Sequence, residues 1–157
     1  MMQRKIIYLL IIITAVLVSG CGFKNINQNI QKILHIEKIN ISGNKRINYV
    51  LKNEIMIYSN ASSTNKITID LNTKKNKNEK IKDISGKITR YNVQIETQMT
   101  IKKNNNIVVK KVFTGAGDYD VGTSHSDTIS AEKKLNKSIA EKISEDIIFF
   151  LNLYYKN

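Results

Sequence analysis

The sequence contains a single cysteine, two histidines and no proline or tryptophan. One cysteine excludes an intramolecular disulfide framework and a zinc site built from several cysteines. The histidines, His35 and His125, form no HExxH-type pair, and no acidic cluster has metal-ligand spacing, so we expect no metal. Gly115-Ala116-Gly117 lacks the further glycine and the Lys-Ser/Thr pair of a phosphate-binding loop, so no nucleotide or other cofactor is expected.

The length of 157 residues is enough for one domain. Hydrophobic residues make up 41% and charged residues 24%, values near the globular average that argue against wholesale disorder and against a collagen-like or multi-span membrane protein. The formal net charge is +12. Because 22 of the 25 basic residues are lysines, and Ile (27) and Asn (19) are over-represented as well, we interpret most of this charge as compositional drift.

Residues 1–20 have the features of an export signal. A positively charged start precedes an apolar run from Ile6 to Val18, which is shorter than the roughly 20 residues of a transmembrane helix. The segment Val18-Ser19-Gly20-Cys21 then resembles the lipobox of bacterial lipoproteins, in which the cysteine is acylated. This resemblance implies lipidation of Cys21. Gly22, in place of the aspartate that retains such proteins at the inner membrane, favours the outer membrane.

The domain organisation that follows is a lipoprotein signal peptide at 1–20, an acylated cysteine and tether at 21–31, and a single α/β domain at 32–157. An exported protein does not meet cytoplasmic nucleic acid, so we expect no nucleic-acid partner. Lipid headgroups, phosphorylated glycolipids and envelope proteins are the anionic partners expected instead.

Hydrophobic periodicity predicts six elements in the mature chain. They are a strand at 33–41, a helix at 45–58 capped by Ser42 or Asn44, strands at 67–72, 91–102 and 107–113, and a long final helix starting near Asp127 or Thr128. This order, β-α-β-β-β-α, predicts an α+β fold: a two-layer sandwich in which about four strands carry two helices on one face. Because residues 91–102 alternate strictly between apolar and polar, the other face should be polar.

Several further segments are assigned to turns and caps. Residues 74–80 are interpreted as a solvated hairpin loop or splayed strand ends, with a contact for an anionic ligand as the alternative. Gly115-Ala116-Gly117 should end or bulge the last strand, and Asp118 and Asp120 are assigned to turn chemistry. Residues 124–127 contain a serine, a histidine and an aspartate, but sequence neighbours rarely face each other as a triad, so helix capping is preferred. We therefore expect a protein that is not an enzyme.

The sequence Cys21-Gly22-Phe23, followed by a small body of this element order, resembles the lipopolysaccharide-assembly lipoprotein family LptE. Residues 46–55 resemble that family's first helix, residues 91–95 its central strand, and residues 113–132 its hairpin exit and the start of its final helix. The resemblance covers nearly the whole mature chain.

This resemblance implies an outer-membrane lipoprotein that plugs and helps assemble an LptD-type barrel and assists lipopolysaccharide transport to the outer leaflet. The barrel and lipopolysaccharide are then its partners, and a lipid anchor on the periplasmic side holds it at the cell outer membrane. A generic envelope lipoprotein, acting as an accessory binding module for a cell-wall enzyme or a transporter, is the second interpretation.

Arg90 is the first candidate for contact with a glycolipid, because it flanks the long strand and a guanidinium binds phosphate bidentately. A structural ion pair is the alternative role for this residue. The remaining candidates are lysines: Lys74, Lys75 and Lys77 in second place, and Lys102 and Lys103 in third.

Overall fold

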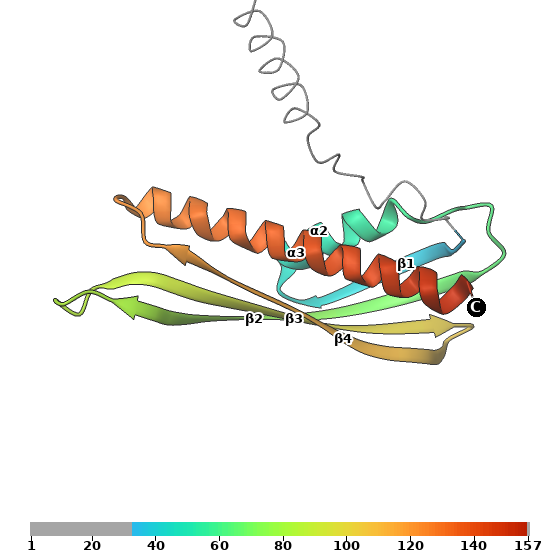
Figure 1. The fold of residues 1–157 in the computed structure, drawn as a ribbon. Coiled ribbons are helices and arrows are strands. Elements are labelled where there is room, and N and C mark those ends of the chain that lie inside the picture. The colour runs from blue at the N-terminus through green and yellow to red at the C-terminus, as the bar shows by residue number, and fades with distance from the viewer. Residues whose placement is uncertain (1–32, 157) are drawn as a thin grey trace, which may run out of the picture. The chain divides into compact units, whose positions relative to one another are not determined.

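The computed structural model describes residues 33–156, which form a four-stranded sheet with two helices on one face (Figure 1). The elements are β1 (His35–Gly43), α2 (Lys45–Met56), β2 (Lys66–Lys82), β3 (Ile88–Lys103), β4 (Asn106–Asp120) and α3 (His125–Lys156). The predicted fold class and element order are confirmed. The signal peptide, Cys21 and the tether to residue 31 lie outside the described residues.

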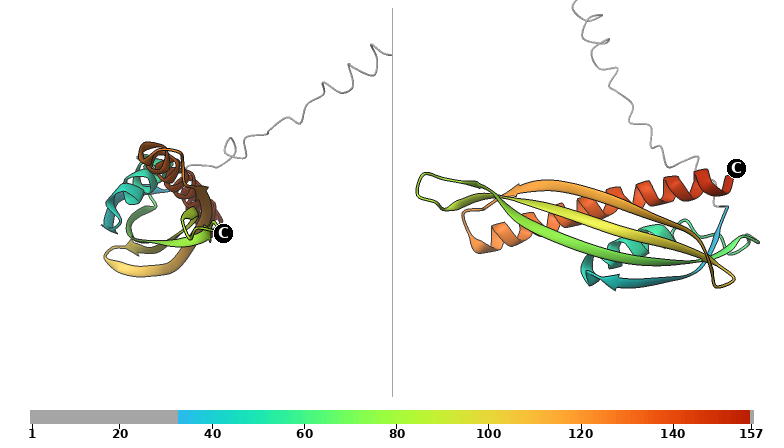
Figure 2. Two further views of the ribbon diagram at one scale, coloured as in Figure 1. Left: turned by 90° about the vertical axis from the view of Figure 1, so that its left-hand side faces the viewer. Right: turned by 90° about the horizontal axis from the view of Figure 1, so that it is seen from below.

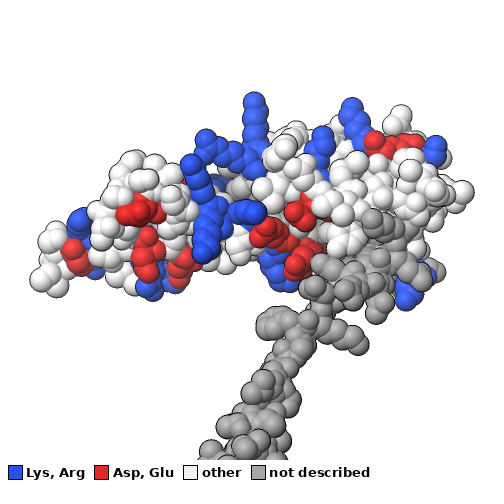
Figure 3. Space-filling model, turned by 90° about the horizontal axis from the view of Figure 1, so that it is seen from above, with Lys and Arg blue, Asp and Glu red and all other residues white. Residues whose placement is uncertain are grey.

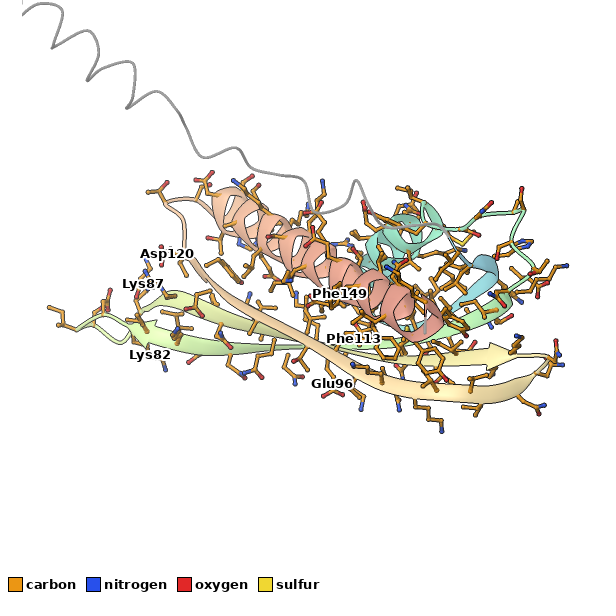
Figure 4. All side chains as sticks on the ribbon, turned by 45° about the vertical axis from the view of Figure 1, so that its right-hand side comes forward. Lys82, Lys87, Glu96, Phe113, Asp120 and Phe149 are labelled. Carbon is orange, nitrogen blue, oxygen red and sulfur yellow. The ribbon has the colours of Figure 1, made fainter. Side chains whose placement is uncertain are left out.

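The strands lie in the order β1-β2-β3-β4. β1 runs parallel to β2, to which it is connected through α2, whereas β2, β3 and β4 form an antiparallel meander. Both helices cover the same side of the twisted sheet, and the view from below shows the other side bare (Figure 2). Phe113 lies between β4 and α3, whereas Glu96 projects from the bare face (Figure 4). The core therefore has one sheet face and two helical stripes, and its largest members include Leu51, Ile55, Ile69, Leu71, Ile95, Met99, Ile143 and Ile147.

The Lys-rich stretch 74–80 is neither a hairpin loop nor a splayed strand end, so both forms of this prediction were wrong, although the stretch does belong to a strand. It belongs to β2 and pairs residue by residue with β3, and the turn lies at 83–87. There the side chain of Asp83 accepts hydrogen bonds from the backbone N–H groups of Ser85 and Lys87, and Gly86 adopts φ +82°. β3 is a long, regular strand that pairs with β2 along this stretch. The pairing outweighs the low strand propensity of lysine and asparagine.

The glycines near the end of β4 neither end nor bulge it, and Asp118 and Asp120 lie in the strand rather than in a turn. Gly115 and Gly117 lie beneath α3. A Cβ atom on Gly115 would lie 2.6 Å from Cγ2 of Ile139, and one on Gly117 would lie 2.7 Å from Cδ1 of Leu135. Glycine is therefore needed here for close approach of the helix to the strand.

Both helices begin at polar caps. The side chain of Asn44 caps α2 by accepting from the Ile47 N–H at 3.2 Å. α3 starts at His125, two residues before the predicted start, because Ser124 and Asp127 form a reciprocal capping box. Across residues 33–156, neither helix combines the length and hydrophobicity that a membrane span requires.

A buried polar junction fixes α2 on the sheet. The Thr73 hydroxyl donates to Oδ1 of Asn48 at 2.8 Å and lies 3.0 Å from the hydroxyl of Thr97. The backbone carbonyl of Thr73 accepts from the N–H of Asn44 at 2.8 Å. Gly43 lies against the same carbonyl with φ +83°, where an added Cβ would come within 2.2 Å of the oxygen. The end of β1, the cap of α2 and the middle of β2 are thereby held at one point.

The two glycines of β4 provide a matched test of helix approach. We expect Gly115→Ala to lower the free energy of unfolding by about 1–3 kcal/mol, because the branched carbon of buried Ile139 has to move. The added Cβ of Gly117→Ala comes too close only to the flexible end of Leu135 and lies at an ordinary contact distance of 3.7 Å from Cδ1 of Ile139, so its effect should stay within about 1 kcal/mol. Chemical denaturation followed by circular dichroism compares them, and equal losses would contradict the proposed close packing at Gly115.

Candidate functional site

The six basic residues predicted to contact a glycolipid do not form one site. Lys75 and Lys77 lie on the helix-covered side of β2, whereas Lys74 lies on the bare face. In the register of β2 and β3, Lys102 lies opposite Thr68. Thr68 is about six residues along β2 from Lys74, so roughly 20 Å separate Lys102 from Lys74.

Two of the predicted residues are already engaged in ion pairs on the bare face. Arg90 donates from Nε to Oδ1 of Asp120 at 2.6 Å, with its side chain 42% exposed. Lys102 pairs with Asp70 at 2.6 Å. Arg90 thus has the structural partner considered from the sequence, while its side chain stays partly exposed.

The lysines of β2 converge on one glutamate of α3. Lys77 lies 2.8 Å from Oε2 of Glu132, Lys75 donates to Oε1 of the same carboxylate, and the Tyr119 hydroxyl donates to Oε2 at 2.8 Å. Lys77 also lies over the ring of Tyr91, which stacks on Tyr119 at 5.6 Å between centroids. Both carboxylate oxygens of Glu132 are therefore occupied, and the cluster ties the first half of α3 to the sheet.

The protonation states in this cluster follow from its geometry. Partial burial disfavours ionised Glu132, but hydrogen bonds from Lys75, Lys77 and Tyr119 outweigh it and lower its pKa from 4.5 to about 2. Burial likewise opposes the charge on Lys77, yet its contacts with Glu132 and Tyr119 raise its pKa. Burial raises the pKa of Tyr119. At neutral pH Glu132 is thus a carboxylate, Lys77 an ammonium group and Tyr119 a neutral phenol.

Beside this cluster a cleft of about 660 Å³ opens between the start of α2 and the first half of α3. Its lining carries many cations but a single carboxylate, that of Glu132. Lys and Arg side chains gather on this helix-covered side of the molecule (Figure 3). We call it the α2–α3 cleft, and its cations are Lys45, Arg46, Lys75, Lys133 and Lys137.

Sequence reasoning missed the α2–α3 cleft, although two local signals pointed to it. The first turn of α2 contains Lys45 and Arg46 and no acidic residue, the reverse of the usual preference at a helix N-terminus. Lys133 and Lys137 are spaced to lie on one helix face. That these two pairs meet depends on how the helices pack. Among residues 33–156, no three His, Cys, Asp or Glu side chains are placed to hold a metal.

Sequence comparison assigns no relative: no protein-family model and no curated protein matches the chain. Solved structures do match. Lipoprotein B from Nitrosomonas europaea is 14% identical, with a TM-score of 0.58 over 87% of this chain and 94% of that one. Rare lipoprotein B from Shewanella oneidensis is 9% identical, with a TM-score of 0.56 over 73% and 92%.

A minor lipoprotein from Acinetobacter baumannii is also similar, at 13% identity and a TM-score of 0.53 over 77% of this chain and 94% of that one. At such identities the likeness establishes a shared fold. The fold of residues 33–156 is thus one also found in three bacterial proteins described as lipoproteins.

The Glu132 cluster predicts a specific pH dependence. Because the pKa of Glu132 is depressed in the folded state, its stabilising effect is fully present above about pH 4.5 and is lost as the pH falls through about 2. We expect Glu132→Gln to lower the free energy of unfolding by about 1–3 kcal/mol at pH 7, with the difference from wild type shrinking towards pH 2.

Glu141→Gln is the matched control, because Glu141 forms only an exposed pair with Lys137, 3.5 Å away. Denaturation curves at a series of pH values measure both variants. A loss for Glu132→Gln that stays constant from pH 5 to pH 2 would contradict the charged cluster.

Proposed function

We propose that this protein is an outer-membrane lipoprotein that plugs and helps assemble an LptD-type barrel and assists lipopolysaccharide transport to the outer leaflet. One combination of observations carries the proposal. The lipobox-like segment Val18–Cys21 precedes a domain whose fold matches bacterial lipoproteins over 92% to 94% of their length. The resemblance of its sequence to the lipopolysaccharide-assembly family LptE selects this role among those open to a lipoprotein.

The bare face of the sheet supports a role inside a barrel. It is mostly polar, with Val112 as an exposed apolar exception, and several of its charges are matched by partners on neighbouring strands. A surface of this kind can lie against the hydrated, polar lumen of a large outer-membrane barrel without burying unpaired charge. The cross-strand pairs on this face are Lys102 with Asp70, Lys80 with Asp118 and Arg90 with Asp120.

The proposed role is one of binding and assembly and requires no catalysis. A phosphorylated glycolipid is a suitable ligand for a chain with surplus cations, because ammonium and guanidinium groups form charge-assisted hydrogen bonds with phosphate. Arg90 at the outer part of β3 is the residue proposed for that contact on the bare face.

Co-purification tests the proposal directly. The tagged full-length lipoprotein is extracted gently from membranes and pulled down, and we expect a heat-modifiable barrel to accompany it in about equal amount. The matched control carries the same residues 1–31 fused to an unrelated domain, so it shares any anchor but not the fold. Equal recovery of the barrel with the control, or recovery of only soluble periplasmic partners, would overturn the plug and favour the accessory-module interpretation.

Arg90 can be separated from its ion pair by two substitutions. Arg90→Glu removes the guanidinium and should weaken lipopolysaccharide binding about tenfold, the loss of roughly one charge-assisted contact. Asp120→Asn breaks the same ion pair but keeps the guanidinium, so binding should be retained. Pull-down on immobilised lipopolysaccharide measures both variants, and equal weakening would assign Arg90 a purely structural role.

A further inference from the structure

The α2–α3 cleft carries more positive charge than its own residues neutralise. Lys45, Arg46 and Lys133 form no ion pair within residues 33–156, although all three line the same cleft. The single carboxylate there, Glu132, is already bound by the two lysines of β2. Three unpaired like charges around one concavity repel each other, and an anion in the cleft would relieve that repulsion.

The direction of α2 adds to this effect. Lys45 and Arg46 occupy its first turn, at the positive end of the helix dipole, where acidic groups are normally favoured. An anion bound beside this turn would interact with both side chains and with the helix end. Charge and helix direction therefore favour the same kind of ligand at the same place.

The neutral part of the lining indicates what else the ligand carries. The amide side chain of Asn136 belongs to a residue that lines the cleft, and amide groups form hydrogen bonds with hydroxyl groups. Ile47, Val50 and Ile129 contribute apolar surface to the same lining. A sugar ring offers both complements, hydroxyl donors at its edge and C–H groups on its faces.

We propose that the α2–α3 cleft binds a phosphorylated sugar. In this arrangement Arg46, Lys45 and Lys133 surround the phosphate, and the amide group of Asn136 forms a hydrogen bond with a hydroxyl of the ring. Phosphate is preferred over a lone carboxylate because its three oxygens and near-double charge match three cations, one of them a guanidinium. The volume of about 660 Å³ lies within the range of small-molecule sites.

The site is distinct from Arg90, which lies on the bare face of the sheet, and the inference rests on the proposed function only for the source of the ligand. The same phosphate-sugar chemistry occurs in a free sugar phosphate and in the headgroup of a phosphorylated glycolipid. A test with a soluble probe therefore stands apart from the presence of any barrel.

The test uses the full mature protein in a polyoxyethylene detergent, which carries no sugar, with glucose 1-phosphate as the probe in isothermal titration calorimetry. Arg46→Gln combined with Lys133→Gln should weaken binding at least about tenfold. The control combines Lys110→Gln with Lys134→Gln, which also removes two cations without an ion pair but leaves the cleft lining intact. We expect the control to bind within about twofold of wild type.

Several outcomes overturn the proposal: no binding of glucose 1-phosphate, equal weakening in the two double variants, or inorganic phosphate binding as tightly as the sugar phosphate. Tighter binding of a hexaglutamate peptide would assign the cleft to an acidic protein segment instead. Competition by lipopolysaccharide distinguishes the sources. If it displaces glucose 1-phosphate, the headgroup occupies the cleft, and if it does not, the cleft takes a soluble sugar phosphate and the proposed transport role loses support.

Discussion

The hydrogen bonds that converge on Thr73 determine how the two layers of this protein meet. The carbonyl oxygen of Thr73 accepts a hydrogen bond from the backbone N–H of Asn44, and its hydroxyl forms hydrogen bonds with the side chains of Asn48 and Thr97. Gly43 lies so close to this carbonyl that any side chain at position 43 would collide with the oxygen. A buried polar group is costly unless it is paired, so this chain of donors and acceptors tolerates little displacement. The position of α2 over the sheet, and with it the direction of its first turn, follows from this one point.

The position of α3 is set by a different group of contacts. α3 lies close to β4 where two glycines leave room for it, and its first half is tied down by Glu132 between the lysines of β2. The two helices also pack against each other, yet the space between the start of α2 and the first half of α3 stays open as the α2–α3 cleft. Most of the side chains that line it come from two helices that lie far apart in the chain, and Lys75 is contributed by β2.

Periodicity in the sequence was sufficient for the architecture. The strict alternation of residues 91–102 and the three-and-four spacing of the helices predicted the layers, the element order and a second face that is mostly polar, Val112 excepted. It failed at 74–80, where lysine and asparagine pointed to a loop, because a long regular partner strand decided the conformation. It also failed at Gly115, whose role depends on a helix that arrives later in the chain. The cleft could not be read from spacing alone, since its cations meet only through tertiary packing.

The outer end of the β2–β3 hairpin, around the turn at 83–87, extends past the last paired residue of β4, and both views of the sheet show it projecting beyond α3 (Figure 1, Figure 2). Ile84 at the turn is fully exposed, so this part of the molecule adds length without adding core. Insertions or deletions made in pairs, one residue in each strand, would change the span of the protein and leave its packing untouched. The length of the protein can therefore be altered at this hairpin alone, independently of the core that holds the sheet and the helices together.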